Sequence, residues 1–189
     1  MVLFSSFLLI GGLFVTKAIV ATEDQSKEAS AGTATEKAVF GAGCFWCVEA
    51  FYENLPGVLE VVSGYAGGEK PDPSYKEVAG GRTKHAEVVE VVYNPDVISY
   101  RELVDFFWIT HDATDPRGVW PDFGPQYRST ILYDSEEQKE AALASKKALE
   151  QSGEIDGPVV TVIEPLQAFY PAEDYHQDYV DHNPDDRYV

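Results

Sequence analysis

Apolar and polar positions alternate with different periods along the chain after residue 37, and the period predicts each element. Runs rich in β-branched residues predict strands at 38–40, 58–65, 85–93, 127–133 and 159–164. Apolar residues at helical spacing predict helices at 48–54, 99–110 and 135–151. Long loops are expected at 66–82 and 112–126. This mixture predicts an α/β sandwich in which helices pack against one sheet.

The first 37 residues have a different pattern and are not expected to belong to the folded domain. Residues 2–15 are almost wholly apolar and small residues follow at 18–21, which is typical of a secretory signal peptide. The alternative is an uncleaved membrane anchor, although the run is short for a full span. We therefore expect a signal peptide or anchor at 1–21, a flexible linker at 22–37 and one domain at 38–189, secreted or periplasmic unless anchored.

The charge of the chain excludes some classes of partner. Its 14 basic and 32 acidic residues give a net charge of −18, which nucleic acids and anionic membranes would repel. No nucleic-acid partner is therefore expected. No heptad pattern or internal repeat indicates self-association, so a monomer is expected.

The two cysteines of the sequence, Cys44 and Cys47, lie between the first predicted strand and the first predicted helix, in the stretch GAGCFWCVE. Backbone N–H groups at a helix start favour negative charge, so we expect Cys44 to ionise more easily than a free thiol. The glycines of this stretch allow a tight turn. Phe45 and Trp46 place apolar surface beside the sulfur. The arrangement favours an apolar substrate that carries an electrophilic atom.

A pair of cysteines at this spacing has several functions in proteins. Zinc needs four ligands, and the four histidines are scattered through the sequence, so a metal-binding module is the weakest alternative. A structural disulfide across so short a loop stabilises little. A thioredoxin-like dithiol exchanger is the sharper alternative, although here Trp46 lies between the cysteines instead of before them. No metal and no bound cofactor are expected.

A candidate proton donor lies in the predicted strand 85–93. Alternation places Glu87 on one face and Glu90 on the other, and both faces carry valines. One of the two carboxyl groups is therefore expected in an apolar setting, where burial raises its pKa and makes it an acid near neutral pH. The alternative is an ordinary glutamate at a strand edge that faces water.

The stretch GCFW at 43–46, followed by Val48 and Glu49, closely resembles the active-site motif of the A-type peptide methionine sulfoxide reductases (the MsrA family), in a variant that reads GCFWC. Further segments are similar to that family and occur in its order: GV at 57–58, SGYAGG at 63–68, PSYKEV at 73–78, HAE at 85–87, HD at 111–112, DFGPQYRS at 122–129 and FYPAEDYHQDY at 169–179. The resemblance implies an α+β fold, a two-layer sandwich of a mixed sheet with helices packed on it, in a ferredoxin-like variant.

The resemblance also implies a role for each matched position. Cys44 is the nucleophile that attacks the sulfur of methionine sulfoxide, and Glu87 protonates the oxygen as it leaves. The rings of Phe45 and Trp46 hold the substrate's methyl group. The phenols of Tyr75 and Tyr127 hydrogen-bond the oxygen, and the carboxylate of Asp122 organises the pocket. A poor leaving oxygen needs such proton donors. The family acts on the S epimer at the sulfoxide sulfur. His176 is expected to have a structural role, and Glu49 is not included in the implied site.

The reaction would leave a sulfenic acid on Cys44, and Cys47 is the one other thiol of the sequence that could resolve it. Attack by Cys47 gives a disulfide, which an external dithiol such as thioredoxin would reduce. The family often has glycine at this position and resolves with cysteines near the C-terminus, but this sequence ends HNPDDRYV. The expected function is thus repair of oxidised methionine, free or in proteins. A dithiol exchanger, the alternative, has no need of Glu87 or the two phenols.

Overall fold

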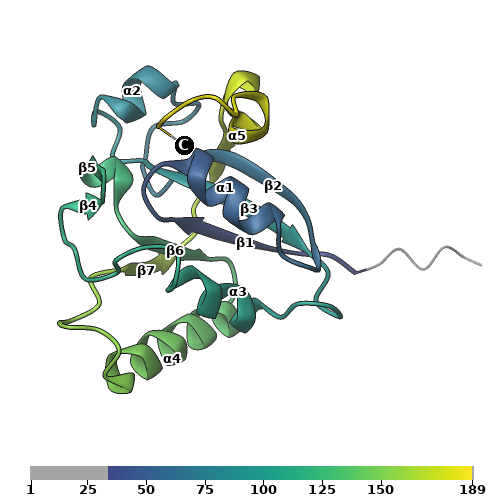
Figure 1. Ribbon diagram of the computed structural model, residues 1–189, viewed down its shortest axis with the longest axis vertical. Helices are drawn as coiled ribbons and strands as arrows, with labels where there is room; N and C mark the ends of the chain where they lie inside the picture. Colours follow the sequence, from purple (N-terminus) through teal and green to yellow (C-terminus); the bar gives the residue numbers. More distant parts are fainter. Residues whose placement is uncertain (1–33, 189) are drawn as a thin grey trace, which may run out of the picture. The chain divides into compact units, whose positions relative to one another are not determined.

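The predicted strands assemble into one six-stranded sheet in the computed structural model, which describes residues 34–188 (Figure 1). The strand order is β7-β6-β1-β3-β2-β8, and only the β6–β7 pair is parallel. The strands are β1 (Glu36–Gly41), β2 (Val58–Ala66), β3 (Ala86–Tyr93), β6 (Thr130–Tyr133), β7 (Val162–Pro165) and β8 (Phe169–Pro171). The sheet is therefore mixed, as the resemblance implies.

Three helices cover one face of this sheet: α1 (Phe45–Glu53), α3 (Tyr100–Phe107) and α4 (Glu136–Ser152). The predicted serine caps are present, because Ser99 and Ser135 each accept a hydrogen bond from the backbone N–H three residues later. Phe40 of β1 lies between rings of two helices, with its centroid 5.1 Å from Tyr52 and 5.5 Å from Phe107. A smaller apolar cluster around Val88 covers the other face of the sheet. The predicted α+β two-layer sandwich is confirmed.

Short elements fill segments that the pattern leaves as loops. They are α2 (Tyr75–Ala79), the paired strands β4 (Gly118–Val119) and β5 (Asp122–Phe123), the 3-10 turns η1 (Pro125–Tyr127) and η2 (Asp174–His176), and α5 (Tyr179–His182). The prediction that 159–164 holds the last strand is wrong, since β8 follows and pairs with β2. A three-residue edge strand has no alternation of its own to reveal it.

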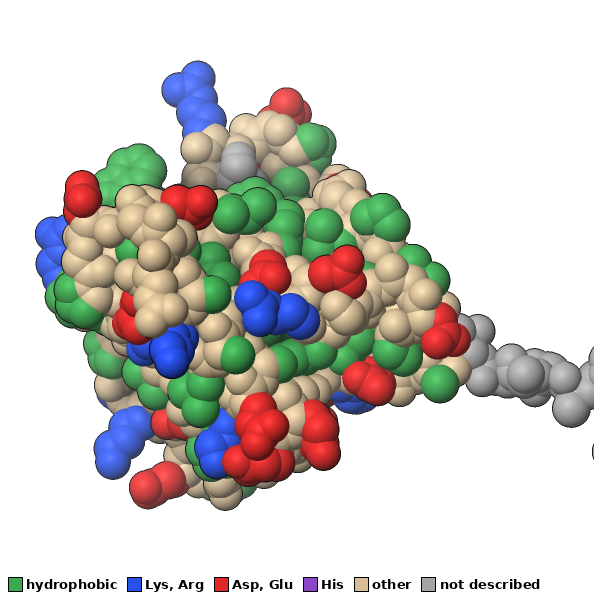
Figure 2. All heavy atoms as spheres, turned by 90° about the horizontal axis from the view of Figure 1, so that it is seen from below, with side chains coloured by type: hydrophobic (Ala, Val, Ile, Leu, Met, Phe, Trp, Pro, Cys, Tyr) green, Lys and Arg blue, Asp and Glu red, His purple; other side chains and the backbone are tan. Residues whose placement is uncertain are grey.

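Two boundaries near the N-terminus differ from the predicted ones. Helix α1 begins at Phe45, three residues before its predicted start, and β1 begins at Glu36, inside the predicted linker. The predicted signal peptide or anchor at 1–21 lies outside the described residues. Within residues 34–188, no helix combines the length and apolar character needed to cross a membrane. On the face shown in Figure 2, acidic side chains are spread among basic and apolar ones.

Candidate active site

Cys44 occupies the junction between β1 and α1, where it is the N-cap residue of α1 with an extended backbone (φ −63°, ψ 122°). Gly43 makes this turn possible, because its φ is +85° and an added Cβ would lie 2.9 Å from the Cβ of Val119. Only 7% of the Cys44 surface is exposed. The junction thus presents the sulfur at the start of a helix, from a largely buried position.

Glu87 is the buried glutamate of β3, and it lies beside the start of α1. Its Oε2 accepts a hydrogen bond from the backbone N–H of Phe45 at 3.2 Å, and only 2% of its surface is exposed. Burial raises the pKa of Glu87 to about 8, with a further contribution from the negative charge of Asp122. Glu87 is therefore mainly a neutral acid at pH 7. Glu90, on the opposite face, pairs with Lys37 at 2.6 Å.

A cavity of about 290 Å³ opens at Cys44. Its walls come from both ends of the domain: Cys44, Phe45, Trp46, Tyr75, Glu87, Tyr127 and Tyr188. Burial raises the pKa values of Tyr75 and Tyr127, so both phenols keep their protons at neutral pH. The cavity therefore combines one sulfur, one neutral carboxyl and phenolic donors with aromatic walls.

Trp46 is held by the C-terminal segment of the chain. Its ring stacks on Tyr179 with centroids 3.7 Å apart, and its Nε1–H donates to Nδ1 of His176 at 3.1 Å. His176 is buried and also packs against Phe45 and Tyr75, with ring centroids 5.1 and 4.3 Å away. The prediction of a structural role for His176 agrees with this position, since the residue fixes the walls of the cavity and does not line it.

Asp122 and Cys47 lie next to the cavity. Asp122, in the β4–β5 hairpin, accepts a hydrogen bond from the hydroxyl of Tyr188. Cys47 is half-buried on the first turn of α1, and both cysteines are free thiols. Residues three apart on a helix face one another, so α1 brings the two sulfurs together. All eight residues predicted for the site therefore gather around the start of α1.

The expectation that Cys44 ionises easily is wrong as stated. Hydrogen bonding with Cys47, burial and the nearby Glu87 all raise the pKa of Cys44, while the same contact lowers the pKa of Cys47 to about 7. The helix N-terminus is a weaker influence than these neighbours. The two thiols therefore titrate as one pair, which loses one proton near neutral pH and holds the other between the two sulfurs.

Tyr188 is the cavity residue that the sequence analysis missed. It is the penultimate residue and belongs to none of the segments that carry the resemblance. Its pKa is raised by burial and by Asp122, so its hydroxyl stays protonated. No periodicity or spacing connects residue 188 with residue 44, and only the folded chain brings them together.

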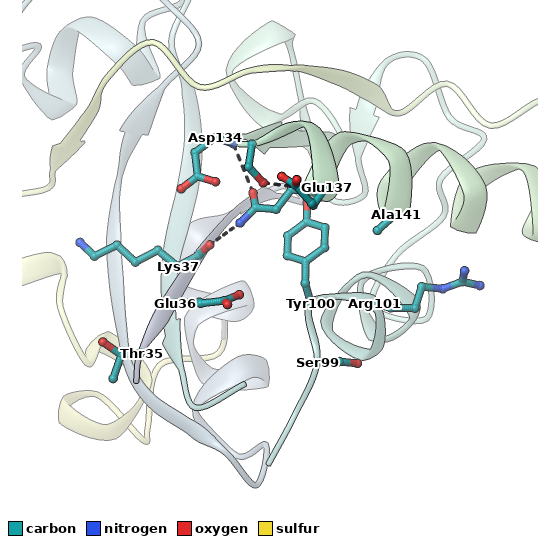
Figure 3. A pocket seen from close by; sticks show the side chains of 11 residues that line it. Thr35, Glu36, Lys37, Ser99, Tyr100, Arg101, Asp134, Glu137 and Ala141 are labelled. Atoms are coloured by element: carbon teal, nitrogen blue, oxygen red, sulfur yellow. Dashed lines mark hydrogen bonds between the residues drawn. The ribbon is translucent and has the colours of Figure 1, made fainter. Parts of the chain in front are cut away.

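A larger groove of about 800 Å³ lies at the other end of β1, beyond Glu36 (Figure 3). Gln138 crosses it, donating from Nε2 to the backbone oxygen of Lys37 at 2.7 Å and accepting from the N–H of Asp134 at 3.2 Å. Its other lining residues include Arg101 and Glu137, and neither cysteine is among them. This groove has no nucleophile of the kind found at Cys44.

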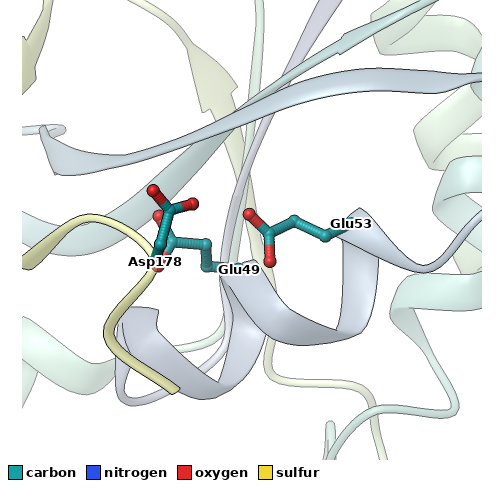
Figure 4. A group of neighbouring side chains, drawn as sticks. All are labelled: Glu49, Glu53 and Asp178. Atoms are coloured by element: carbon teal, nitrogen blue, oxygen red, sulfur yellow. The ribbon is translucent and has the colours of Figure 1, made fainter. Parts of the chain in front are cut away.

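Three carboxylates, from Glu49, Glu53 and Asp178, have oxygens within 4.8 Å of one another (Figure 4). Burial is the main cause that raises the pKa values of Glu49 and Glu53 to about 7. Among the described residues this is the one cluster with the spacing of a metal site, and it contains neither cysteine. The interpretation of Cys44 and Cys47 as half of a zinc site therefore has no support from the fold.

Comparisons with known proteins agree with this geometry. A family model described as peptide methionine sulfoxide reductase matches residues 36–189. The peptide methionine sulfoxide reductase MsrA of Natronomonas pharaonis is 50% identical over 154 residues, 82% of this chain and 86% of that protein. The protein of the same name from Methanothermobacter thermautotrophicus is 50% identical over 149 residues, 79% of this chain and 88% of that protein.

Solved structures give the same result for the fold. Mxr1 from Saccharomyces cerevisiae in its reduced form has a TM-score of 0.74 and 40% identity, over 80% of this chain and 87% of that chain. A structure of Mxr1 in complex with Trx2 matches with a TM-score of 0.55 and 28% identity, over 78% of this chain and 86% of that chain.

Proposed function

This chain belongs to the peptide methionine sulfoxide reductase family and reduces methionine sulfoxide to methionine, and we propose that the reaction takes place in the cavity at Cys44. The observation that carries the assignment is Glu87, a buried carboxyl that is neutral near pH 7 and bonded to the first turn of the helix that Cys44 caps. A dithiol exchanger has no leaving oxygen to protonate and no need for such an acid.

The first step forms a bond between the sulfur of Cys44 and the sulfur of the sulfoxide. The proton of Cys44 passes to the Cys47 thiolate, whose pKa of about 7 allows it to be present at neutral pH. Glu87 gives its proton to the sulfoxide oxygen, and Tyr75 and Tyr127 donate hydrogen bonds to it. The protonated oxygen then moves to the sulfur of Cys44 as a hydroxyl, the S–O bond of the substrate and the new bond between the two sulfurs both break, and methionine and a cysteine sulfenic acid remain.

The second step joins the two cysteines. The sulfur of Cys47 attacks the sulfenic sulfur of Cys44, a disulfide forms, and the hydroxyl of the sulfenic acid leaves as water with the proton of the Cys47 thiol. The hydrogen-bonding contact between the two thiols places their sulfurs next to each other before this step. Glu87 takes its proton back from solvent before the next turnover.

An external dithiol must then reduce this disulfide, and a thioredoxin is the proposed reductant. The similarity to Mxr1, for which a complex with Trx2 is known, supports this proposal. Cys47 is half-buried, whereas Cys44 is buried, so Cys47 is the more accessible sulfur for an attacking thiolate. The proposed substrates are methionine S-sulfoxide in oxidised proteins and as the free amino acid, and the proposed working state is a monomer.

A single-turnover experiment tests the proposal. The reduced protein, freed of reductant, is mixed with excess methionine S-sulfoxide, and both the methionine formed and the thiols remaining are measured. We expect about one methionine per chain and the loss of both thiols. C47S should still form one methionine, more slowly because the thiolate that accepts the Cys44 proton is gone, and it should not turn over with thioredoxin. Methionine with one thiol left in the unaltered protein would exclude Cys47 as the resolving residue, and intact thiols without methionine would favour the dithiol exchanger.

We also propose that the enzyme works outside the cytoplasm, where it would repair proteins exposed to oxidants. The support is the apolar run at 2–15 and the small residues at 18–21 of the sequence. Mass spectrometry of the protein purified from the producing cells tests this. A mature chain that begins near residue 22 supports export, whereas an intact N-terminus in a membrane fraction supports an anchor.

A further inference from the structure

The end of the chain closes one side of the active-site cavity through Tyr188, which the reaction above does not use. Its ring lies edge-on to Trp46, with centroids 6.0 Å apart and an angle of 88° between the ring planes. Its hydroxyl donates a hydrogen bond to Asp122 Oδ2. Two contacts from different elements therefore hold a side chain that is still 45% exposed.

The segment before Tyr188 is fixed to the same indole ring. Tyr179 stacks on Trp46 and donates from its hydroxyl to Asp186 Oδ2 at 2.9 Å. Asp186 Oδ1 in turn accepts from the backbone N–H of Tyr188 at 3.0 Å. The chain thus passes over one face of Trp46, turns at Asp186 and returns to the ring edge. This loop gives Tyr188 a defined position beside the cavity.

We propose that Tyr188 is a specificity-determining residue whose ring, together with Trp46, limits the size of the alkyl group on the sulfoxide sulfur. The inference rests on the proposed function, because it concerns the same cavity. Edge-to-face packing of aromatic rings is favourable beyond the area that it buries, so Tyr188 and Trp46 form one continuous wall. Both rings line the cavity of about 290 Å³ at Cys44, where a longer alkyl group on the sulfoxide sulfur would compete with Tyr188 for space. Hydrophobic pockets discriminate one methylene by about 10–200-fold.

Asp122 acts on this wall through the hydroxyl of Tyr188. The hydrogen bond fixes the direction of the ring, and the carboxylate comes from the β4–β5 hairpin, which also packs against Gly43 through Val119. Loss of the hydroxyl alone therefore leaves the ring present but less well placed. Tyr188 therefore positions the substrate and selects its size. It takes no part in the proton transfers, which involve Glu87 and the two thiols.

The test compares two substrates that differ by one methylene, the S-sulfoxides of N-acetyl-methionine and N-acetyl-ethionine. Single-turnover rates are measured over a range of substrate concentrations for the unaltered protein and for Y188A, Y188L and Y188F. We expect Y188A to lower the methyl-over-ethyl preference in kcat/KM about tenfold. Half-saturation for the methyl substrate should rise, with the limiting rate changed less than about twofold. Y188L should fall between, and Y188F should change the preference about two- to threefold.

F51A is the matched control, because Phe51 lies on α1 with 46% of its surface exposed and does not line the cavity. It should leave the preference unchanged. The inference is wrong if Y188A and Y188L keep the methyl preference of the unaltered protein, or if they lower only the limiting rate. Failure of the proposed function has a different signature, since the unaltered protein would then form neither methionine nor ethionine derivative.

Discussion

Two cavities lie at opposite ends of β1, and they differ in how their polar groups are compensated. In the groove of about 800 Å³ beyond Glu36, Gln138 satisfies backbone groups and the charged side chains reach water. In the cavity of about 290 Å³ at Cys44, a carboxyl is buried with one backbone N–H as its hydrogen-bond donor. Burial in the smaller cavity is incompletely compensated, which keeps Glu87 protonated and favours the proposed reaction there.

The comparison is tested most strongly by removing the acid from the reactive cavity. E87Q preserves the shape of the side chain but cannot give up a proton, so the single-turnover rate should fall about 10²–10³-fold. E90Q is the matched control on the opposite face of the same strand, where the carboxylate pairs with Lys37 and lies outside the cavity at Cys44. The rate of E90Q should stay within about twofold of the unaltered protein. Equal rates for E87Q and E90Q would remove Glu87 from the chemistry.

The pH dependence of the rate gives the next largest effect. Glu87 must be protonated, so the single-turnover rate should fall about tenfold per pH unit above its pKa of about 8. The thiol pair must lose one proton, so the rate should also fall below the pKa of Cys47, about 7. We expect a narrow maximum between these values. E87Q should lose the alkaline limb and keep the acid limb, whereas loss of the acid limb would assign the groups the other way round.

The sequence predicts those parts of the site that depend on local chemistry, and it does not predict those that depend on contacts between distant segments. The residues around Cys44 act through local chemistry, a strand-to-helix junction and the GCFW motif, so they are recognisable from their order. The alternation of the strand leaves two candidates for the buried acid, Glu87 and Glu90. It does not decide between them, because the face of the strand that is covered depends on α1 and on the neighbouring strands. Tyr188 could not be predicted, since its place depends on a turn of the C-terminal segment at Asp186.

The prediction that Cys44 ionises easily is wrong for a related reason. The helix N-terminus is visible in the sequence, and it favours a thiolate. The opposing influences come from Cys47 in the same turn and from Glu87 on a distant strand, and their strength depends on contact and burial. A sequence pattern gives the sign of one influence at a time, whereas the folded site adds them.

Burial of Glu87 should make the free energy of unfolding depend on pH. The pKa of Glu87 is about 8 in the folded protein and about 4.5 in the unfolded chain. The folded state therefore binds more protons between these values, so the free energy of unfolding should decrease as the pH rises from about 4.5 to about 8, by a few kcal/mol in total. E87Q has no such proton to lose. Urea unfolding should show E87Q more stable than the unaltered protein at pH 9 and nearly equal at pH 4.

If the difference in the free energy of unfolding between E87Q and the unaltered protein did not change with pH, the buried carboxyl of Glu87 would not be its cause. E90Q again serves as the control, because the Glu90 carboxylate is paired with Lys37, and the difference in stability between E90Q and the unaltered protein should be the same at both pH values.

The groove at the other end of β1 should show the converse behaviour, an effect on stability without one on activity. Gln138 is 8% exposed and bonds to the backbone of Lys37 and Asp134. Q138A leaves both groups unsatisfied, which should lower the free energy of unfolding by about 1–3 kcal/mol. E137A, an exposed neighbour in the same groove, should change it by less than about 0.5 kcal/mol. Single-turnover rates of both variants should match the unaltered protein, since no group of this groove reaches Cys44. A rate lowered in Q138A but not in E137A, under conditions where both are folded, would instead connect the two ends of β1.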